Sequence, residues 1–468
     1  MGMGASTYRL FPDQAAWIAG LSSAFGQHRR VLGVACTGFG KTVCFSEIVR
    51  RTVDRGHSVV VLAHRIEIVR QIGRALARSG VAFGWVLPGQ ATPGERVLVG
   101  MVQTIANRLG AIAPPKLLVV DEAHHATAGS YARITDAWKD SYVLGVTASP
   151  ARTDGRGLGD AFDALVEGPP MEELIARGRL SGFDYFAPPV TANLAGVTTR
   201  AGDYAQDQLA AAMDQRSVTG DAVRTYAHRL AGRPAIAFCV SVDHAHHVAQ
   251  QFAEAGWKAE SVDGSTDADV RADRIAAIGD GRLNVLTSCD IISEGTDIPV
   301  VAGAILLRPT QSLIVYLQQV GRVLRPKPDN SRAVILDHCG NVLNHGMPDQ
   351  PREWTLEGRQ KRTGPTPVRQ CSKCYAAFRP APRCPCCGHS FETAPKPRAQ
   401  LKQKAGELEQ VTEIKRAPVK RDDLLRMTRS ARSLPELQDL ARKLNYSSRW
   451  AFMTFQARQG RRSAGRRT

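Results

Sequence analysis

The sequence predicts an α/β protein with two tandem domains built on parallel sheets, followed by a small cysteine-rich module and a basic helical C-terminal segment. Two successive series of short Val- and Leu-rich runs alternate with amphipathic stretches, a pattern typical of parallel strands that helices cover on both faces. Five of the ten cysteines lie within the seventeen residues 371–387. The last 73 residues contain 19 Lys and Arg but only 7 Asp and Glu.

The two series of apolar runs define the expected domains. The first series consists of VLGVA, SVVVLAH, RVLVG, KLLVVDEAHH and YVLGVTAS, and the second of AIAFCV, AESVDG, LNVLTS, AGAILL and RAVILD. An irregular stretch over about 187–202 separates them. Because 468 residues exceed what a single hydrophobic core normally supports, we expect a first domain over 7–186 and a second over 203–346.

The chain changes character after Met347. The stretches MPDQPREW and GRQKRTGPTPVRQ are polar and rich in Pro and Gly, which predicts a linker. We expect the cysteine module over 368–393 and the basic segment over 396–468. Within that segment the apolar spacing predicts a small helical hairpin, formed by Leu437, Leu440, Leu444, Trp450, Phe452 and Phe455.

The net charge of +17 is concentrated in the C-terminal segment, which carries +12 from Lys396 onward. A basic tail on a nearly balanced body indicates a polyanionic partner, foremost a nucleic acid; a solvated tail that only aids solubility is the alternative. The longest apolar runs are too short to span a membrane, and no signal peptide is visible. Scattered single cysteines indicate a reducing compartment, so we expect a cytoplasmic protein without membrane association.

The segment ACTGFGKT, residues 35–42, directly follows the first apolar run. Ligands of open parallel sheets bind beyond the carboxyl ends of the strands. Gly38 and Gly40 allow the backbone N–H groups to point toward one phosphate, Lys41 is placed to reach the β- and γ-phosphates, and Thr42 offers a hydroxyl to Mg²⁺. Ala35 stands where this pattern usually has its first glycine. An ordinary glycine turn between strand and helix is the alternative.

A pair of acids closes another apolar run, LLVVDEAHH. Asp121 follows four apolar residues and is placed to hold Mg²⁺ through water, while Glu122 is the candidate base that orients and deprotonates the attacking water. The alternative is a helix start, in which both acids favour the positive end of the helix dipole.

The cysteine module contains two C-x-x-C pairs separated by nine residues. This spacing fits a tetrahedral, structural Zn²⁺ site of the zinc-ribbon type. The expected ligands are Cys371, Cys374, Cys384 and Cys387. Cys386 competes with Cys387, His389 is a less favoured ligand, and disulfides are the alternative to metal. Gly388 suits the tight turn after the second pair.

Aromatic and basic residues are interleaved within the cysteine module. Tyr375 and Phe378 lie among Lys373, Arg379 and Arg383. These side chains fit either nucleic-acid contact or, for the two aromatics, the packing of a small core.

Because the module follows the two-domain core in the sequence, we expect ATP hydrolysis to persist after zinc is removed.

The phosphate loop and DEAH together resemble the superfamily 2 DEAD/DEAH-box helicases and translocases, and further motifs occur in the order of that family over about residues 8–345. LFPDQ resembles the adenine-reading segment, with Phe11 where Arg is usual. LAHRIEIVRQ (62–71) and GMVQTIANR (100–108) resemble strand-contacting motifs, and TAS (147–149) resembles the link between ATP state and nucleic acid. EGTDIP (294–299) resembles the second-domain nucleotide and strand motif, and QQVGRVLRP resembles the arginine-finger helix.

The resemblance implies two RecA-like domains that bind ATP and Mg²⁺ between them and pull on a nucleic-acid strand as they close and open. The implied catalytic residues are Lys41, Asp121, Glu122, Arg322 and Arg325. The implied nucleotide-binding residues are Gln14, Thr37, Gly38, Gly40, Lys41, Thr42, Gly295 and Asp297. The implied nucleic-acid contacts are Arg65, Gln103, Thr104, Thr147, Ser149 and Thr287. The implied Mg²⁺ ligands are Thr42 and Asp121. For Arg322 and Arg325, an exposed basic helix is the alternative.

A helicase core followed directly by a cysteine ribbon resembles the RadD-like bacterial and phage branch, which is associated with DNA repair and replication. We therefore expect an ATP-dependent DNA helicase or translocase in repair, recombination or replication, associated with the nucleoid. Its expected partners are single-stranded or branched DNA and a single-strand-binding, repair or replication protein. The alternatives are an RNA-dependent ATPase, a non-catalytic module in which ATP acts as a switch, and a motor subunit of a restriction or defence system without its own nuclease.

Overall fold

The computed structural model describes residues 9–125, 129–150, 157–188, 197–200, 203–213, 216–289, 292, 300–357, 368–391, 431, 433–443, 451 and 454–455. The chain forms two compact units, 1–393 and 394–468. All ten apolar runs identified in the sequence form strands, and the predicted α/β class with two parallel sheets is confirmed.

The first sheet has seven parallel strands in the order β3-β4-β2-β5-β6-β1-β7. Five of them are the expected runs: β1 (Arg30–Val34), β2 (Val59–Ala63), β4 (Val97–Met101), β5 (Leu117–Asp121) and β6 (Tyr142–Thr147). The edge strands β3 (Gly84–Val86) and β7 (Ala164–Glu167) are additional. The central strands are buried throughout, as expected for a sheet covered on both faces.

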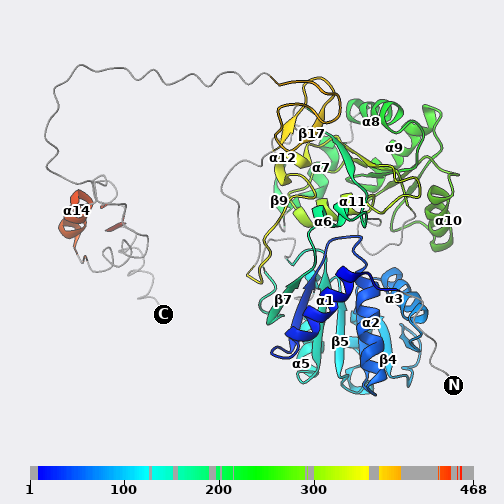
Figure 1. Ribbon diagram of the computed structural model, residues 1–468, viewed down its shortest axis with the longest axis vertical. Coiled ribbons are helices and arrows are strands. Elements are labelled where there is room, and N and C mark those ends of the chain that lie inside the picture. Colours follow the sequence, from blue (N-terminus) through cyan, green and yellow to red (C-terminus); the bar gives the residue numbers. More distant parts are fainter. Residues whose placement is uncertain are drawn as a thin grey trace. The chain divides into compact units, whose positions relative to one another are not determined.

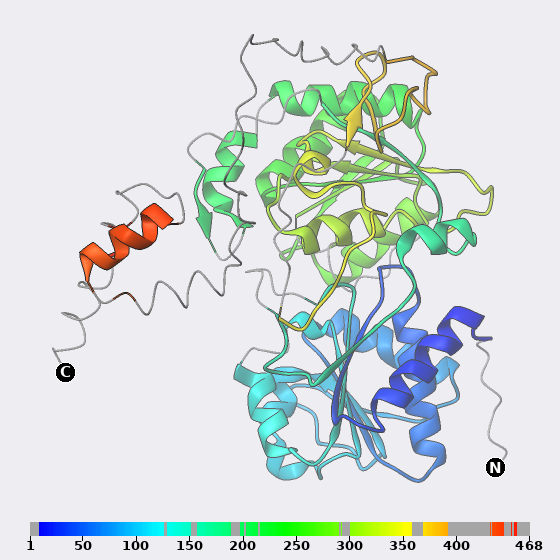
Figure 2. The same ribbon diagram turned by 60° about the vertical axis from the view of Figure 1, so that its left-hand side comes forward.

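Helices cover both faces of this sheet (Figures 1 and 2). One face packs against α1 (Pro12–Ala24), α2 (Lys41–Asp54) and α3 (Ile66–Arg78). The other packs against α4 (Val102–Ala106) and α5 (Gly129–Ala137). Two short 3₁₀ turns, η1 (Leu109–Ala111) and η2 (Ala123–His125), follow β4 and β5. Alternate residues along each strand contribute to the two cores, because successive side chains point to opposite faces.

The second sheet has eight strands in the order β12-β13-β11-β14-β15-β8-β17-β16. The five expected runs form β11 (Ala235–Phe238), β12 (Ala259–Val262), β13 (Val285–Ser288), β14 (Gly303–Leu306) and β15 (Ala333–Asp337). The next strand, β8 (Phe183–Phe186), pairs in parallel with β15. The range 7–186 expected for the first domain thus includes a strand that pairs in the second sheet.

The helices associated with the second sheet are α8 (Arg216–Arg229), α9 (Val242–Glu254), α10 (Ala268–Gly279), α11 (Leu313–Gly321) and α12 (Asn341–His345). A short helix, α6 (Met171–Ala176), precedes β8 at the connection between the domains. Strands β9 (Thr199–Arg200) and β10 (Asp203–Tyr204) form a separate hairpin before α7 (Gln206–Met213).

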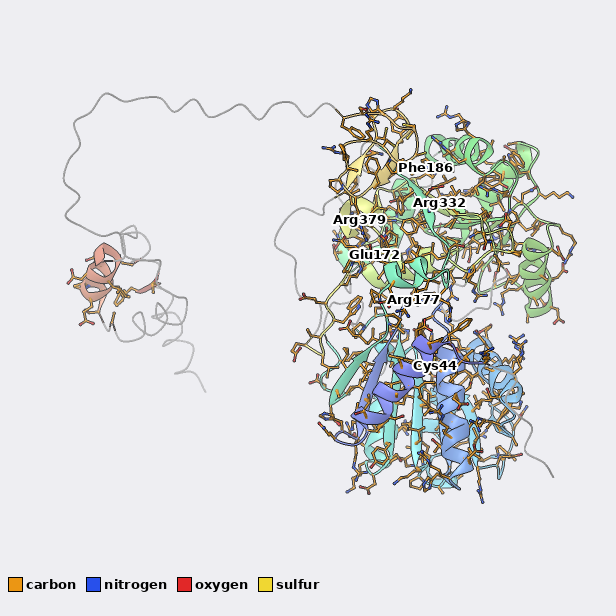
Figure 3. All side chains as sticks on the ribbon, in the orientation of Figure 1. Cys44, Glu172, Arg177, Phe186, Arg332 and Arg379 are labelled. Atoms are coloured by element: carbon orange, nitrogen blue, oxygen red, sulfur yellow. The ribbon has the colours of Figure 1, made fainter. Side chains whose placement is uncertain are left out.

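The cysteine module adds two strands to the edge of the second sheet. Strand β17 (Ala376–Phe378) pairs antiparallel with β8, and β16 (Arg369–Gln370) pairs with β17. An ion pair continues this attachment to α6, since Arg379 Nη1 lies 2.9 Å from Glu172 Oε1 (Figure 3). The module therefore extends the second sheet and is not a separate domain joined only by a linker.

The segment after α12 does not behave as the simple linker that its composition predicts. Residues 347–357, the strap, run back to the first domain, where Leu356 O accepts a hydrogen bond of 2.8 Å from Gly159 N. Trp354 packs against the cores on both faces of the first sheet. The strap thus joins the two domains a second time.

In the second unit, the predicted helical pattern begins with α14 (Leu434–Lys443). Leu437, Ala441 and Ala451 form a small buried cluster with Phe455 packed against it. Leu444, Trp450, Phe452 and the rest of the basic tail lie outside the described residues. Among the described helices, none has both the length and the apolar character needed to cross a bilayer.

Candidate active site

The phosphate loop joins β1 to α2 with the geometry expected of an anion cradle. Gly38 and Gly40 have φ angles of 90° and 94°, a region that side chains rarely adopt. The N-terminus of α2 begins immediately after Gly40, so its unpaired N–H groups point into the loop. Lys41 Nζ donates a hydrogen bond of 3.1 Å to Ala35 O. The lysine head therefore lies inside the loop, where a phosphate would compete for it.

Gln14 supports the loop from behind. Its Nε2 donates to Phe39 O at 2.9 Å, and its Oε1 accepts from Phe11 N at 3.1 Å. A Cβ added to Gly40 would lie 2.6 Å from Gln14 Nε2, so a side chain there would displace the Gln14 amide in addition to straining the backbone. Phe11, which stands where the family has Arg, is 49% exposed and stacks against the guanidinium of Arg179 at 3.0 Å from the ring centroid. Arg179 thus brings a guanidinium to this place from a distant part of the chain.

The two acids of DEAH lie at the carboxyl end of β5 in different environments. Asp121 is 8% exposed; burial raises its pKa to about 7, the neighbouring Glu122 carboxylate raises it as well, and the Lys41 ammonium opposes both. Such a carboxyl is stabilised in its ionised form by a cation placed beside it. The donor set of Thr42 and Asp121 therefore fits Mg²⁺, a hard cation that prefers oxygen ligands.

Glu122 has a φ of 49°, a left-handed conformation that costs a non-glycine residue about 1 kcal/mol or more. Its backbone N–H donates to Asp121 Oδ1 at 3.0 Å. Among the described residues its buried Oε2 accepts no hydrogen bond, and His124 Nδ1 lies 3.5 Å away. The strained backbone thus holds a buried carboxylate oxygen to which no described residue donates. This arrangement fits an oxygen that accepts a hydrogen bond from a water molecule.

His124 connects the acids to the TAS motif. Thr147 Oγ1 donates to Ser149 O at 2.9 Å and accepts from Ser149 N at 3.2 Å. His124 Nδ1 lies 3.2 Å from the same oxygen. Because the Thr147 hydroxyl already donates its only proton, the histidine must act as the donor through Nδ1–H. A series of side-chain contacts thus runs from Glu122 through His124 and Thr147 to Ser149.

The second domain meets the phosphate loop through α11. A Cβ added to Gly321 would lie 2.5 Å from the Cβ of Thr37, so helix and loop are in contact at these two residues. Arg322 follows at the C-terminal end of α11, and Arg325 is held by its carbonyl, which accepts from Ser181 Oγ at 3.1 Å. Elsewhere along the interface Arg271 Nη2 lies 3.1 Å from Glu67 Oε1. Residues more than 280 positions apart in the sequence are thus in contact beside the phosphate loop. Gly295 and Asp297 lie outside the described residues.

Three of the six residues expected to contact nucleic acid are buried. Thr147, Ser149 and Thr287 are at most 2% exposed, and Thr287 Oγ1 donates to Ala245 O at 2.7 Å. The hydroxyls of Thr147 and Thr287 thus donate to backbone carbonyl groups inside their domains. Of the others, Arg65 is the N-cap of α3, and Gln103 and Thr104 lie on α4 with Gln103 exposed.

The comparisons with known proteins agree with this arrangement. Residues 7–152 match the family model of the type III restriction enzyme res subunit, and residues 219–327 match the helicase conserved C-terminal domain. A 51.5 kDa protein of a Lactococcus phage is 34% identical over 360 residues, which is 76% of either chain. The chain belongs to the superfamily 2 helicases.

This helicase also resembles a Saccharomyces cerevisiae protein assigned as the ATP-dependent helicase IRC3. The two are 27% identical over 344 residues, covering 67% of this chain and 49% of the yeast protein, so the match spans about half of that relative. A fragment assigned as an HsdR subunit of a type I restriction enzyme from Vibrio vulnificus shares the fold, with a TM-score of 0.59, 19% identity and coverage of 74% of this chain and 67% of that one. The helicase is an ATP-hydrolysing enzyme.

The four expected zinc ligands of the helicase converge. The sulfur atoms of Cys371, Cys374, Cys384 and Cys387 lie within 4.8 Å of one another. Two of the separations, Cys371–Cys387 and Cys374–Cys384, are 3.6 Å. Sulfurs around a tetrahedral zinc lie about 3.8 Å apart, so the donor set fits Zn²⁺. Cys387 belongs to the cluster and Cys386 does not, a choice that the sequence left open.

The two aromatics of the module have different roles. Phe378 is 7% exposed and packs against the second domain and against Phe391, at 5.8 Å between ring centroids. Tyr375 is 48% exposed. Arg379 is engaged by Glu172 and by Asp349, whose Oδ2 lies 3.3 Å away. Phe378 and Arg379 thus attach the module, while Tyr375 faces outward.

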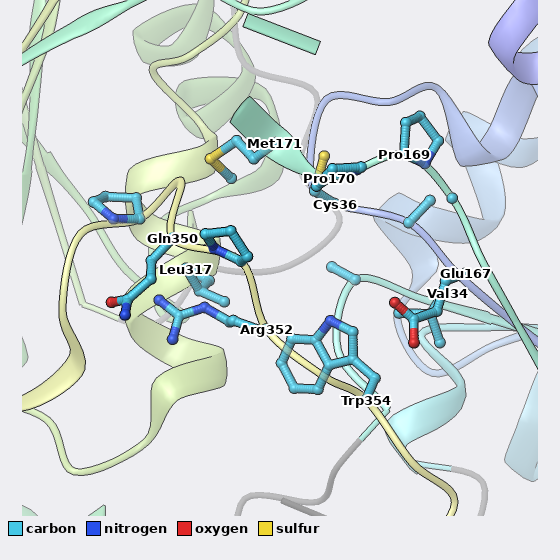
Figure 4. A pocket seen from close by; sticks show the side chains of 15 residues that line it. Val34, Cys36, Glu167, Pro169, Pro170, Met171, Leu317, Gln350, Arg352 and Trp354 are labelled. Atoms are coloured by element: carbon cyan, nitrogen blue, oxygen red, sulfur yellow. The ribbon is translucent and has the colours of Figure 1, made fainter. Parts of the chain in front are cut away.

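A cleft of about 300 Å³ lies beside the phosphate loop of the helicase, and sequence reasoning did not identify it (Figure 4). Cys36 and Glu167 border it from the first domain, Leu317 of α11 from the second, and Arg352 and Trp354 from the strap. The strap residues were missed because their polar, Pro-rich sequence resembles a linker. The apolar residues Met347, Trp354 and Leu356 within that polar stretch are the signal that was available.

Proposed function

We propose that this superfamily 2 helicase is an ATP-dependent DNA helicase or translocase, in which ATP hydrolysis between the domains drives movement along DNA. The observation that carries the proposal is the contact between Thr37 on the phosphate loop and Gly321 on α11. A γ-phosphate bound beside Lys41 would lie where Arg322 and Arg325 approach from the other domain. Closure of the cleft is then linked to the presence of that phosphate.

In this proposal Lys41 and the loop amides hold the β- and γ-phosphates, and Thr42 and Asp121 hold Mg²⁺. Mg²⁺ held by Thr42 and Asp121 would supply positive charge next to the phosphates. Glu122 orients and deprotonates the attacking water. His124 and Thr147 transmit its state to Ser149 through the hydrogen bonds described above. The family resemblance adds Gly295 and Asp297 of the EGTDIP motif to the proposed nucleotide-binding residues.

The charge of the tail favours a nucleic acid of either kind, and two further features favour DNA over RNA. The tail carries a net charge of +12 from Lys396 onward, and phosphate contacts of this kind supply much of the affinity for DNA. The order of core and cysteine ribbon resembles the RadD-like branch. A protein whose fold resembles this one, the type ISP restriction-modification enzyme LlaBIII, was solved bound to DNA; its TM-score is 0.51, with 14% identity over 70% of this chain and 28% of that one. The resemblance to the RadD-like branch also supports a role in repair, recombination or replication, with a single-strand-binding protein as partner and association with the nucleoid.

The experiment that tests the proposal measures phosphate release with single-stranded, duplex and forked DNA and with single-stranded RNA. Parent enzyme should be stimulated by at least one DNA substrate and less by RNA. Lys41→Ala should abolish hydrolysis because the phosphates lose their cation, while nucleotide-free DNA binding persists. Stronger stimulation by RNA than by every DNA would replace the proposal with an RNA-dependent ATPase. Hydrolysis by Lys41→Ala within a few-fold of the parent would show that the loop is not the ATP site.

A motor subunit of a restriction or defence system is the second candidate. It is favoured by the match of residues 7–152 to the res subunit model. Such a motor would move along duplex DNA without separating its strands. Displacement of a third strand from a triplex, without unwinding of a forked duplex, would favour this candidate, whereas unwinding of the fork would favour the helicase.

A further inference from the structure

A basic groove of about 590 Å³ lies between α8 and the first pair of zinc-site cysteines, on the side of the second domain where β8 and β15 end. Its walls come from four segments that are distant in the sequence, namely the end of β8 with the two residues after it, the last two turns of α8, the end of β15 with the residue after it, and the turn that follows Cys371. The basic side chains and the tyrosine that line it are Arg224, His228, Arg229, His338, Lys373 and Tyr375. None of these residues takes part in the ATP cleft described above.

Tyr375 lines the groove and has a backbone conformation that residues other than glycine rarely adopt. Its φ is 60°, and its N–H donates to Cys371 O at 2.9 Å in the turn after the first cysteine pair. The second pair makes the same turn, in which the N–H of Gly388 donates to Cys384 O at 2.9 Å with a φ of 70°. Glycine satisfies this geometry without strain. A half-exposed tyrosine at the equivalent place is therefore not explained by folding and points to a use for the ring.

The exposed charge in the groove is positive. Among the described residues that line the groove, the one acid is Asp337, which is 1% exposed and whose Oδ2 accepts a hydrogen bond of 2.8 Å from Tyr185 OH. Its charge is thus enclosed in the core rather than displayed. Arg229 forms part of the wall, since its Nη2 donates to Cys374 O at 3.0 Å and its guanidinium lies 4.2 Å from the ring centroid of Phe186, labelled in Figure 3.

The groove has a rigid frame. Strand β17 begins directly after Tyr375 and pairs with β8, and Ala187 N donates to Tyr375 O at 3.2 Å. The tyrosine backbone is therefore bonded on one side to the cysteine turn and on the other to the second domain. A ring carried on such a frame loses little conformational freedom when it stacks on a ligand.

We propose that this groove binds a single strand of nucleic acid, with Arg224 and Lys373 contacting phosphates and Tyr375 stacking on a base. The proposal deepens the proposed function by adding a second point of contact with the strand, and it rests on that function. Flat aromatic rings above a basic groove are the usual means of holding single strands without regard to sequence. An acidic peptide would satisfy the positive charge but would leave the flat face of Tyr375 without a matching partner.

The test uses the full chain with zinc bound and a fluorescein-labelled oligothymidine, with affinity measured by anisotropy. Tyr375→Gly should weaken binding by about tenfold, the value expected for one lost stack. Its melting temperature should be unchanged or higher because glycine relieves the positive φ. Lys373→Ala should make the slope of log affinity against log salt shallower by about 0.7, as expected for one single-strand phosphate contact. Lys258→Ala is the matched control, since Lys258 is exposed and precedes β12 at the opposite edge of the same sheet.

A second readout locates the strand directly. An oligonucleotide containing 5-iodouracil should cross-link to Tyr375 on irradiation, and peptide mapping should identify that residue. Parent affinity retained by both Tyr375→Gly and Lys373→Ala, without a cross-link at Tyr375, would overturn the inference. If the two variants keep the DNA affinity of the parent but no longer bind a polyglutamate peptide that the parent binds, the inference is also overturned, and an acidic protein partner is favoured. If DNA does not stimulate the parent enzyme at all, the proposed function fails instead.

Discussion

Thr37 of the phosphate loop and Gly321 of α11 are packed so closely that a Cβ on Gly321 would lie 2.5 Å from the Cβ of Thr37. Two further side-chain atoms of Thr37 lie within 3.1 Å of the same position. Since real Cβ atoms do not approach other atoms to 2.5 Å, either the loop or the helix has to move to admit any side chain at residue 321. The closest approach of the two domains at the nucleotide site thus depends on the absence of one methyl group.

Gly321→Ala should prevent full closure of the cleft. Nucleotide binding to the first domain should persist because Lys41 and the loop are unchanged. Hydrolysis should fall by on the order of 10²-fold, because a shift of about 1 Å misplaces the arginines. The measurement is phosphate release beside binding of a fluorescent ATP analogue. Gly264→Ala is the control, because a Cβ there meets nothing within 4 Å; equal hydrolysis by the two variants would contradict the role given to this contact.

Glu122→Gln should trap the closed state. The substitution keeps the shape of the side chain and leaves Asp121 in place but removes the base, so ATP should bind and hydrolysis should fall by on the order of 10²-fold or more. DNA affinity in ATP should then differ clearly from that in ADP. Arg325→Ala should lose hydrolysis and also this dependence on nucleotide, since the second domain no longer senses the γ-phosphate. Normal hydrolysis by Glu122→Gln would mean that DEAH does not supply the base.

One zinc should be found per chain, and it should stabilise the second domain. Cys387→Ser should lose the metal, whereas Cys386→Ser, outside the cluster, should keep it. Because β17 pairs with β8, loss of the metal removes an edge of the sheet, and we expect the melting temperature of Cys387→Ser to fall by about 5 °C or more. The sequence alone places the module outside the core; with β17 in the sheet, we expect DNA-stimulated hydrolysis to decline as well. Elemental analysis that finds no zinc in protein purified without chelators would refute the site.

Deletion of the residues after Lys396 should weaken DNA binding equally for all sequences. Fewer counterions are released when phosphate contacts are lost, so the slope of log affinity against log salt should become shallower. The measurement is a salt titration of oligonucleotide binding by the parent and truncated chains. A slope that does not change would show that the tail serves only solubility.

Lys327 should make the stability of the helicase depend on alkaline pH. Burial lowers its pKa from 10.5 to about 8, and its Nζ donates to Val323 O at 3.1 Å. Between pH 8 and 10.5 the unfolded chain binds the proton that the folded chain has released, so stability should rise with pH across this window. The melting temperature of the parent should therefore rise relative to that of Lys327→Met from pH 8 toward 10. Parallel curves for the two proteins would show that Lys327 does not titrate in this range.

Elements with a strong local pattern could be predicted from the sequence. The ten predicted strands come from short apolar runs, which are typical of a sheet covered on both faces, and each was found within a few residues of its expected place. Gly38, Gly40 and Lys41 predict a phosphate loop, because phosphate binding needs glycine backbone angles and a cation within a few residues of one another. The two cysteine pairs are likewise local, and their sulfurs converge as expected.

The sequence by itself therefore determined the class of the fold, the order of the motifs and the sets of candidate ligands, since each depends on neighbours along the chain. Only the tertiary structure decided which distant segments meet. It assigned the short strand β8 to the second sheet, joined the cysteine module to that strand through β17, and selected Cys387 over Cys386. It also brought Thr37 to Gly321 and Tyr375 to the groove beside α8. These contacts depend on strand pairing and packing between residues that are far apart in the sequence. Short edge strands and polar connections have no periodic pattern of apolar residues from which such contacts could be predicted.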